Sequence, residues 1–420
     1  MELTKERTRS AELALVAAFF IQGFLAITYL PRIPEIIDQI DVSFGVWGLI
    51  IGLAGLGALI PLLITNRLVG KFGTRPIVRI SSVMIVFATV SLGFATNGFV
   101  YFIFHALMMF SMSFLNIAVN AQSVMLQKKV KQVIIGKFHA SWSIGAGISA
   151  AVSGILASFM SLQLHLVLVG LVSLVAFQFA IRLMLTPEED GHHEERQAAI
   201  KVPFFKSPPQ LWLLAFGFFA GVFPEMVMMD WSAVFAKEIM LLDPTLGAIP
   251  FTAFTVAMIA GRLLIGRATK RYHISELSKW GGIMGAVAML LGVLVAPLLV
   301  PINGILALAV LSLFWLVSGF GLAPMVPSFF GAAGHVAGLT TSQALSRMLL
   351  VNTITVSLAK IFMGALAQGI GLGLAFIFPV TLMFIAGILA GRVAKNSKRK
   401  EAVDNAFPLT GPITVVDDLS

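Results

Sequence analysis

The sequence predicts an all-α membrane protein with twelve transmembrane helices arranged as two pseudo-symmetric six-helix bundles. Three observations predict this fold: the apolar composition, the length of the apolar segments and the placement of the basic residues. Of the 420 residues, 58% are hydrophobic and only 12% are charged, whereas soluble domains carry about 25% charged residues. The mean hydropathy is +0.94. We infer that the bilayer is the solvent for most of the chain.

The apolar segments have the length of membrane-spanning helices. A bilayer core about 30 Å thick needs about 20 apolar residues per helix, and backbone groups in lipid must be satisfied by a helix or a closed barrel. The runs are too long and unbroken for the alternating strands of a barrel. The expected helices are 11–30, 46–66, 77–96, 99–125, 139–160 and 162–185, followed by 210–236, 244–266, 277–297, 302–324, 341–367 and 372–393.

A single long polar stretch divides the chain into two halves. The predicted organisation is a cytoplasmic N-terminus at 1–10, a first bundle at 11–185, a linker at 186–209, a second bundle at 210–393 and a tail at 394–420. We expect the tail to be cytoplasmic and disordered, because it is polar.

The basic residues alternate between the two sides of the membrane. Of the 29 Lys and Arg residues, 25 fall at the termini, in the central linker or near every second connection. The exceptions are Arg32, Lys237, Arg347 and Lys360. Because cytoplasmic loops are enriched in Lys and Arg, we expect both termini on the cytoplasmic side of a bacterial inner membrane.

Several function classes lack their motifs. The chain has no cysteine, no phosphate-binding G-x-x-x-x-G-K-[ST] loop and no H-E-x-x-H or G-x-S-x-G constellation, which argues against thiol metal sites, ATP-driven transport and enzymatic activity. His192 and His193 are interpreted as part of a solvated linker. We therefore predict no cofactor and no metal, and no nucleic-acid binding, since the charges lie in short loops.

Two short basic turns occupy equivalent places in the two halves. The first runs over Asn66–Arg75 and the second over Gly266–Tyr272. They resemble the signature loop of the major facilitator superfamily, G-x-L-x-D-R-x-G-x-R/K, at Leu68, Lys71, Gly73 and Arg75 in the first half. In the second half the matches are Gly266 and Arg271. The Asp of the signature, which helps to latch the cytoplasmic side in that family, is absent from both.

Further patches resemble the fucose-permease-like branch of that superfamily, which includes sugar and drug transporters. They are Arg32–Pro34, Asn116–Ala121, Phe138–Gly145, Glu225 with Asp230–Val234, and Gly261–Leu263. The resemblance implies the major facilitator fold and transport of a solute, but it does not identify the substrate. The branch has proton-binding carboxylates in its first and fourth helices, which have no obvious match here.

Glu225 and Asp230 are the acidic residues well inside a predicted span. An ionisable group in the bilayer costs about 2.5–3.5 kcal/mol on insertion scales, so each needs a reason. One interpretation is that Glu225 or Asp230 binds a proton or a solute hydroxyl. The alternative for Asp230 is a cap or gate contact near the outer end of its helix. Pro224 removes a helical hydrogen bond beside Glu225. The five-residue spacing places the two carboxylates about 140° apart, so we do not expect a close pair.

Lys360 lies among apolar residues and shares a helix face with Thr353. It is interpreted as a cationic site for an anionic or polyhydroxyl solute, as a partner for Glu225, or as a structural charge pair. The other candidates for solute binding or coupling are Gln22, Asn116, Asn120, His139, Trp142 and Asn352. The candidates for gating are Arg32, Lys71, Gly73, Arg75, Arg262, Arg271 and Arg347. Arg32 is expected to form an external ion pair with Glu35, Asp38 or Asp41.

The leading hypothesis is a secondary active transporter of a small solute, a sugar or an organic anion, working by alternating access with proton coupling as an open alternative. Efflux of drugs by the same fold, or a non-transporting receptor or assembly factor, are the alternatives. The expected partners are the solute, the lipid bilayer and, if coupling exists, protons. We expect a monomer.

Overall fold

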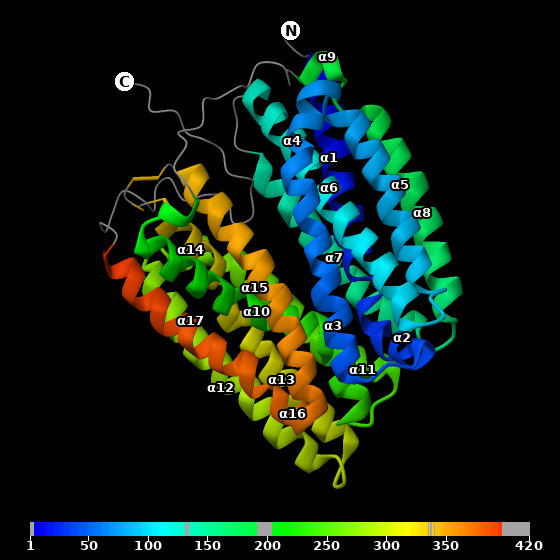
Figure 1. The fold of residues 1–420 in the computed structure, drawn as a ribbon, viewed down its shortest axis with the longest axis vertical. Helices are drawn as coiled ribbons and strands as arrows, with labels where there is room; N and C mark the ends of the chain where they lie inside the picture. Colours follow the sequence, from blue (N-terminus) through cyan, green and yellow to red (C-terminus); the bar gives the residue numbers. More distant parts are fainter. Residues whose placement is uncertain are drawn as a thin grey trace.

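The computed structural model describes residues 4–130, 134–190, 204–334, 336, 338–339 and 341–396. Helices joined by short connections make up this part of the chain (Figure 1). The predicted disordered tail lies almost entirely outside the described residues, as do His192 and His193.

The first half contains six spans. The helices, in chain order, are α1 (Lys5–Ile27), η1 (Leu30–Arg32), α2 (Ile33–Ile40), α3 (Phe44–Gly55), η2 (Leu56–Ala58), α4 (Leu59–Phe72), α5 (Thr74–Leu92), α6 (Gly98–Val130), α7 (Ile135–Leu156) and α8 (Leu162–Leu183). The first span combines α1, η1 and α2, and the second combines α3, η2 and α4.

The second half repeats this organisation after α9 (Pro187–Asp190) and η3 (Phe204–Lys206). Its helices are α10 (Pro209–Glu238), α11 (Pro244–Ala268), α12 (Ile274–Leu299), α13 (Gly304–Leu322), α14 (Met325–Ala333), α15 (Thr341–Ile370), α16 (Leu372–Ala375) and α17 (Ile377–Asn396). The predicted spans therefore coincide with observed helices, with ends that differ by several residues.

Eleven of the described helices are long and apolar enough to cross a membrane by length and composition alone. The one remaining predicted span, 139–160, corresponds to α7, which is 22 residues long. It is rich in Gly and Ser, because it packs closely on α1: a methyl group added at Gly145 would lie 2.2 Å from the backbone oxygen of Phe20. Small residues that allow such approaches are typical of helix interfaces in membranes.

Two departures from the predicted helices have proline at the break. The first predicted helix, 11–30, instead ends at Ile27 and turns through η1 into α2, with Pro31 and Pro34 at the starts of the two short helices. After α13, the chain continues as α14 beyond the predicted end at 324, directly after Pro324. Proline lacks the N–H of a continuing helix and is tolerated in the first turn.

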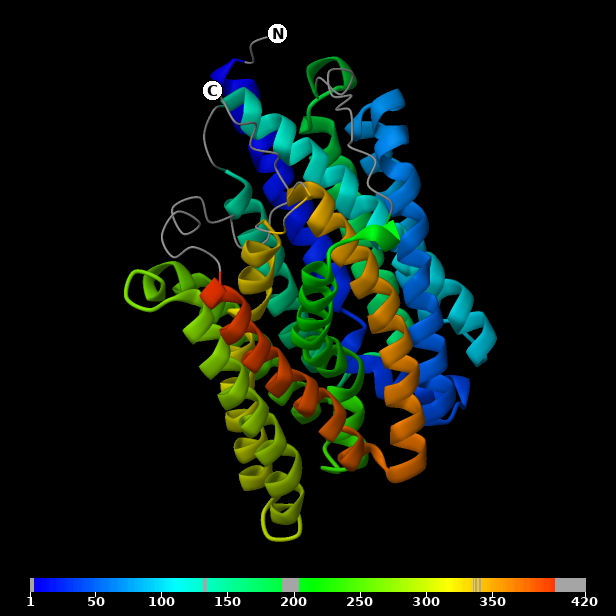
Figure 2. The same cartoon turned by 60° about the vertical axis from the view of Figure 1, so that its left-hand side comes forward.

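The packing pattern is the same in the two halves. In each half the third span packs on the fourth (α5 on α6, α12 on α13) and on the sixth (α5 on α8, α12 on α17). In each half the second span also packs on the fourth, as α3 and α4 do on α6 and as α11 does on α13. These matching pairs confirm two pseudo-symmetric bundles (Figure 2).

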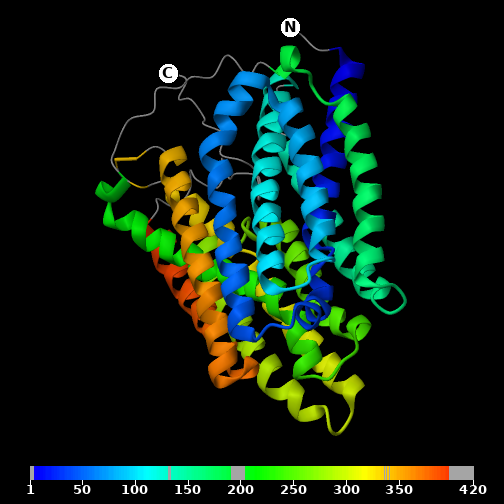
Figure 3. The same cartoon turned by 45° about the vertical axis from the view of Figure 1, so that its right-hand side comes forward.

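The two halves meet through symmetry-related helices, α3 with α15 and α7 with α11. A methyl group added at Gly48 would lie 2.5 Å from Cα of Gly364, and one added at Gly154 would lie 2.5 Å from Cβ of Ala248. Added methyl groups at Gly70 and Gly266, toward the other end, would meet nothing within 4 Å. The halves converge at the end opposite the termini and diverge toward the termini (Figures 1 and 3).

Candidate functional site

Helix α10 holds the two buried carboxylates of the second half. Glu225 is 9% exposed and Asp230 is 5% exposed. The helix runs through Pro224, which interrupts its backbone hydrogen bonding one residue before Glu225. Since buried charges in a membrane protein require partners, the identity of those partners decides what the site can do.

Glu225 pairs with Arg262 of α11. The Nη2 atom of Arg262 donates to Oε2 of Glu225 at 2.9 Å, and the two side chains are 16% and 11% exposed. The hypothesis that Glu225 pairs with Lys360 is therefore wrong. Arg262, predicted as a gating residue at the end of its helix, instead lies inside the half as the counter-ion of Glu225.

Asp230 pairs with Lys360 of α15. The Nζ atom of Lys360 lies 2.7 Å from Oδ2 of Asp230, with side-chain exposures of 13% and 7%. Asp230 is thus an ion-pair partner inside the span rather than a helix cap. The 140° separation expected between the two carboxylates explains why Glu225 turns to α11 while Asp230 turns to α15.

Three polar aromatic side chains of the first half lie beside the Asp230–Lys360 pair. The ring centroids of Tyr29 and His105 are 6.1 Å apart, and those of Tyr101 and His105 are 5.4 Å apart. Asp230 is within electrostatic range of both tyrosines, and Lys360 is within electrostatic range of His105. The pair therefore belongs to the second half and lies within electrostatic range of polar groups of the first.

Aromatic contacts close this region between the halves. Phe44 of α3 contacts the ring of Trp231 edge-on at 5.8 Å, and Trp47 contacts Tyr101 at 5.3 Å. Several buried polar atoms here have no hydrogen-bond partner within the described part of the chain: Trp47 Nε1, Tyr101 Oη, His105 Nδ1 and Trp231 Nε1. Because buried polar atoms in proteins are normally paired, these atoms are available to a ligand or to water.

The amide candidates of the first half make local contacts. Gln22 is buried, and its Nε2 donates to Sδ of Met112 at 3.5 Å. Asn120 donates to the backbone oxygen and to Oδ1 of Asn116, one turn away on α6. Asn116 is exposed and Asn120 is buried, so only Asn116 presents a free surface.

The remaining binding candidates are half-buried. The rings of His139 and Phe19 meet edge-on at 5.0 Å, and Trp142 lies on the face of α7 that packs against α1. The Nε2 atom of His139 and the Oδ1 atom of Asn352 are buried with no hydrogen-bond partner among the residues described. The structure does not bring His139, Trp142 or Asn352 into direct contact with the α10 ion pairs through any interaction it shows.

Arg32 is buried and links several elements of the first half through its side chain. It is 1% exposed and bonds Glu35 twice at 2.6 Å, the backbone oxygen of Met160 at 2.9 Å and Nδ1 of His165 at 3.3 Å. The ion pair with Glu35 was expected, but all of these contacts lie within one half, so Arg32 does not bridge the halves as an external gate. That contact is made by Lys237, whose Nζ lies 2.5 Å from Asp38 Oδ2.

The signature loop docks on the short helix α9. Gly73 has φ +80°, a conformation that favours glycine, and an added methyl group would meet Pro187 at 2.8 Å. Asp190 accepts from the backbone N–H and the hydroxyl of Thr74 at 2.8 and 2.9 Å. Asp190 thus caps α5 from the linker, beside the loop that lacks the Asp of the family signature.

The other gating candidates lie at the terminal end of the molecule. Arg75 donates to the backbone oxygen of Arg182 at 2.9 Å, and Lys71 lies over the ring of Phe72 at 5.1 Å. Arg347 donates to Oγ of Ser207 at 2.6 Å, which ties α15 to the start of α10. Arg271 is exposed in the turn after α11.

Sequence reasoning missed the residues that complete the site. The chain has only three tyrosines, and two of them, Tyr29 and Tyr101, are buried beside the ion pair. His105 interrupts an apolar span and is 3% exposed. The cost of a polar group in lipid was the available signal for all three, but no spacing rule joins them to α10.

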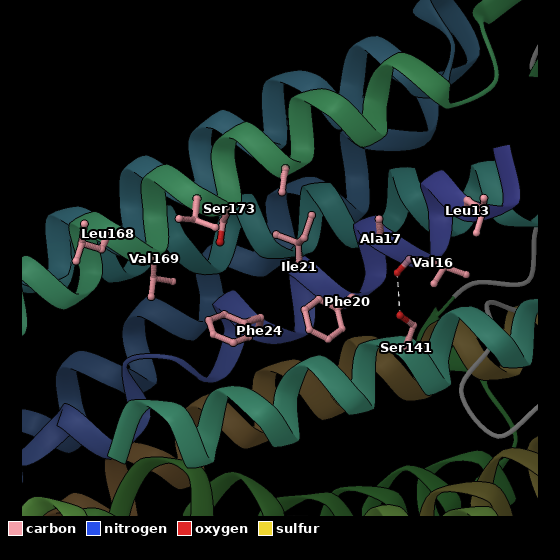
Figure 4. A pocket seen from close by; sticks show the side chains of 12 residues that line it. Leu13, Val16, Ala17, Phe20, Ile21, Phe24, Ser141, Leu168, Val169 and Ser173 are labelled. Atoms are coloured by element: carbon pink, nitrogen blue, oxygen red, sulfur yellow. Dashed lines mark hydrogen bonds between the residues drawn. The ribbon is translucent and has the colours of Figure 1, made fainter. Parts of the chain in front are cut away.

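An apolar groove lies on the outside of the first half, between α1, α7 and α8 (Figure 4). Its volume is about 700 Å³. Ser141 and Ser173 are the polar residues of its lining, and the Ser141 hydroxyl donates a hydrogen bond to the backbone oxygen of Val16 at 2.8 Å. Leu13 and Val172 at its edges are 58% and 69% exposed.

Two six-helix halves with charges buried inside the spans define the class of membrane proteins that carry solutes between two half-bundles. The chain belongs to the Major Facilitator Superfamily, whose family model matches residues 15–342. It is a multi-pass membrane transporter of that superfamily and not an enzyme.

Curated relatives match almost the whole chain. The uncharacterised transporter y4wD of Sinorhizobium fredii is 25% identical over 383 residues, covering 90% of this chain and 95% of that one. An uncharacterised MFS-type transporter of Yersinia pestis is 24% identical over 378 residues, covering 87% and 91%. The sequence resemblance to the superfamily is thus confirmed, while the fucose-permease-like branch stays a prediction.

Solved structures share the fold. A bacterial homologue of the human lysosomal transporter Spinster, in an inward-facing and occupied conformation, has a TM-score of 0.75 at 14% identity, covering 94% of this chain and 98% of that one. The nucleoside transporter NupG has a TM-score of 0.71 at 14% identity, covering 92% and 100%. At this identity the similarity shows the fold alone.

Proposed function

We propose that the protein moves a small polar solute, a sugar or an organic anion, by secondary active transport with alternating access. The observation that supports this most is that two carboxylates of α10 each form a buried ion pair with a neighbouring helix, Glu225 with Arg262 of α11 and Asp230 with Lys360 of α15. Glu225 lies near the middle of α10 and Asp230 lies further along the same helix, and transporters of this architecture bind solutes and coupling ions near the middle of the membrane. Buried charges are costly in lipid and mark such sites.

The arrangement of the halves supports an alternating mechanism. They are closed at the end opposite the termini, by glycine contacts between α3 and α15 and by the Asp38–Lys237 pair. If the termini are cytoplasmic, as the basic residues predict, this state opens toward the cytoplasm. The inward-facing conformation of the similar Spinster homologue is consistent with that orientation.

Glu225 is the proposed protonation site if transport is coupled to protons. Its counter-ion Arg262 keeps a fixed charge, so protonation of Glu225 releases the guanidinium and changes the contact between α10 and α11. One elementary charge crossing 100 mV supplies about 2.3 kcal/mol, which is enough to drive accumulation.

Flux in proteoliposomes tests this function. Uptake of radiolabelled sugars and organic anions is measured with and without an uncoupler in wild type, Glu225→Gln and the exposed control Glu276→Gln. We expect Glu225→Gln to lose the effect of the uncoupler and Glu276→Gln to keep it. Unchanged coupling in Glu225→Gln discards the role of Glu225, and an absence of any flux favours a receptor or assembly factor instead.

The proposed location is a bacterial inner membrane, with both termini in the cytoplasm and the protein acting as a monomer. A reporter enzyme fused after Lys206 tests the orientation. We expect activity only for a reporter that works inside the cell, and activity of an externally active reporter reverses the topology.

Efflux of amphipathic compounds is a second candidate, and the apolar groove of Figure 4 favours it. A groove between α1 and α8 that is open at its edges suits compounds that reach the protein from the bilayer. Drug-sensitivity profiling of a strain that lacks the protein separates the candidates: broad sensitisation favours efflux, and an unchanged profile favours uptake of a polar solute.

A further inference from the structure

The Asp230–Lys360 pair has the geometry of a carboxylate-binding site already occupied by a protein carboxylate. The Asp230 oxygen lies 2.7 Å from the Lys360 ammonium, which is the distance of a strong charge-assisted hydrogen bond. The neighbouring acid, Glu225, is held by Arg262 at 2.9 Å. A solute carboxylate has the same charge and shape as the Asp230 carboxylate. It therefore fits the place of Asp230 as the partner of Lys360.

Lys360 is also the more accessible member of its pair. Its side chain is 13% exposed, against 7% for Asp230. A solute entering between the halves therefore reaches the ammonium with less rearrangement than it needs to reach the carboxylate. This favours an anion on Lys360 over a cation on Asp230.

Electrostatics then requires a proton. Leaving one member of a buried ion pair without its partner is strongly unfavourable, because the remaining charge is not compensated. If a solute carboxylate takes Lys360, Asp230 becomes such a charge. Protonation of Asp230 removes the cost, and Tyr29 and Tyr101 of the first half lie within electrostatic range of this carboxyl.

We propose that the solute is a small hydroxylated carboxylate, which replaces Asp230 on Lys360 while Asp230 takes up one proton. This rests on the transport function proposed above. A proton from solution forms an O–H bond with an Asp230 oxygen, Lys360 keeps its ammonium, and no other bond is made or broken. The solute's negative charge and the proton's positive charge cancel, so the loaded site has the same net charge as the empty site.

The hydroxyl groups of the solute match the unpaired polar atoms nearby. Trp47 Nε1, Tyr101 Oη and Trp231 Nε1 are buried and have no hydrogen-bond partner in the described ranges. Each of them is a donor. A ligand with several hydroxyl oxygens satisfies such donors, whereas an apolar carboxylate leaves them unpaired, which is unfavourable for each buried donor.

The other charged groups around Asp230 have their own ion-pair partners or lie at a distance, and the remaining ionisable groups are the side chains of Tyr29, Tyr101 and His105. Helices α13 and α14 carry no charged residue, and α17 has Arg392 and Lys395 near its far end. The titratable or charged groups of the elements packed on this part of α10 are Tyr29, Arg32 with Glu35, Asp38 with Lys237, Tyr101, His105, Glu225 with Arg262, and Lys360. Asp230 is the carboxylate among them that a solute on Lys360 would leave unpaired.

Binding to the purified protein tests the proposal independently of flux. The probes are glucuronate, galacturonate and gluconate, their uncharged counterparts glucose and galactose, and the cation glucosamine. Isothermal titration in two buffers of different ionisation enthalpy gives both the affinity and the number of protons taken up. We expect at least one of the three acids to bind wild type with uptake of about one proton, and the uncharged sugars and the amine not to bind.

Variants assign the two roles. We expect Asp230→Asn to bind the acid more tightly than wild type and without proton uptake, because Lys360 is already free. Lys360→Gln should lose binding by about tenfold or more, while the exposed control Lys270→Gln should bind as wild type does. Since Lys360→Gln leaves Asp230 unpaired, the neutral double variant Asp230→Asn/Lys360→Gln is included as a folded form that should not bind.

The proposal is overturned if none of the three acids binds wild type, if an acid binds without proton uptake, or if glucose or glucosamine binds wild type and Lys360→Gln equally. The transport function fails separately. If an acid binds but no flux occurs in proteoliposomes, the binding site is supported and the transport role is rejected. If an uncharged sugar is transported and Lys360→Gln does not alter its flux, transport is supported and the proposed binding site is rejected.

Discussion

The two halves share a helix packing pattern but bury charge in different places. In the described first half, the ion pairs Arg7–Glu189, Lys137–Glu12 and Arg32–Glu35 lie at the ends of helices. In the second half, Glu225–Arg262 and Asp230–Lys360 lie inside the spans. The first half contributes aromatic and histidine side chains to the region between the halves. The difference indicates that the second half holds the charges of the site and the first half its closing wall.

Replacing one member of a buried ion pair should lower the stability of the protein the most. Lys360→Met leaves Asp230 unpaired in the second half and should destabilise the protein by about 3–5 kcal/mol. Lys137→Met breaks the Glu12 pair of the first half, whose lysine is 63% exposed, and should cost less than about 1 kcal/mol. Thermal unfolding of the purified variants in detergent measures both losses.

The neutral double variant Asp230→Asn/Lys360→Met tests whether the unpaired charge of Asp230 causes this loss of stability. It removes both charges together and should recover most of the stability that Lys360→Met loses. Equal, small losses for Lys360→Met and Lys137→Met would show that the charges inside the second half are no more buried than those at the ends of the first.

A smaller effect is expected where the halves touch through glycine. Gly48→Leu places a side chain against the backbone of Gly364, and overpacking of this kind costs about 1–3 kcal/mol. The closed contact between α3 and α15 should then lose population by roughly tenfold or more. Because the chain has no cysteine, a single Ser357→Cys on α15 reports the opening by its rate of thiol labelling.

The control for this experiment is Gly266→Leu, since a methyl group at Gly266 meets nothing within 4 Å. Labelling of Ser357→Cys should accelerate with Gly48→Leu and stay unchanged with Gly266→Leu. Equal labelling in both backgrounds would mean that the α3–α15 contact does not open.

The smallest effect concerns the terminal end of the first half. Hydrogen bonds from Arg7 lower the pKa of Glu189 from 4.5 to about 2, against the opposing effect of burial. A lowered pKa in the folded state contributes stability above pH 4.5 that is lost as the pH falls toward 2. Wild type should exceed Glu189→Gln by about 1 kcal/mol at pH 7.

Unfolding measured from pH 7 to pH 3 tests this pair. The stability difference between wild type and Glu189→Gln should shrink below pH 4.5 and stay constant above it. A difference that grows on acidification would exclude the ion pair with Arg7 as its source.

Much of the fold follows from the sequence, because long apolar runs in lipid must be helices and basic residues mark one side. The span α7 was predicted as the apolar segment 139–160, although its Gly and Ser lower its hydropathy. The predicted end of the first helix at residue 30 lies within three residues of its observed end at Ile27, but the continuation as α2 (Ile33–Ile40) was not predicted. The two prolines at the break start new helical turns after it, which an apolar segment alone does not indicate.

The site could be predicted only in part. The cost of charge in lipid identified Glu225, Asp230 and Lys360, and helical geometry predicted that the two acids face different neighbours. The pairing itself depends on which helices pack on α10, and one sequence does not contain that information. For the same reason Arg262 was expected at a gate rather than beside Glu225.

In the proposed mechanism, the halves must separate at the end opposite the termini for solute to pass. Asp38 and Lys237 lie on opposite halves at that end, and their side chains are 62% and 39% exposed. In Asp38→Cys/Lys237→Cys, a short bifunctional thiol cross-linker that reduction removes would join them. We predict that proteoliposome flux stops on cross-linking and returns on reduction, with neither single-cysteine variant affected. Flux that continues unchanged in the fully cross-linked protein would contradict the account.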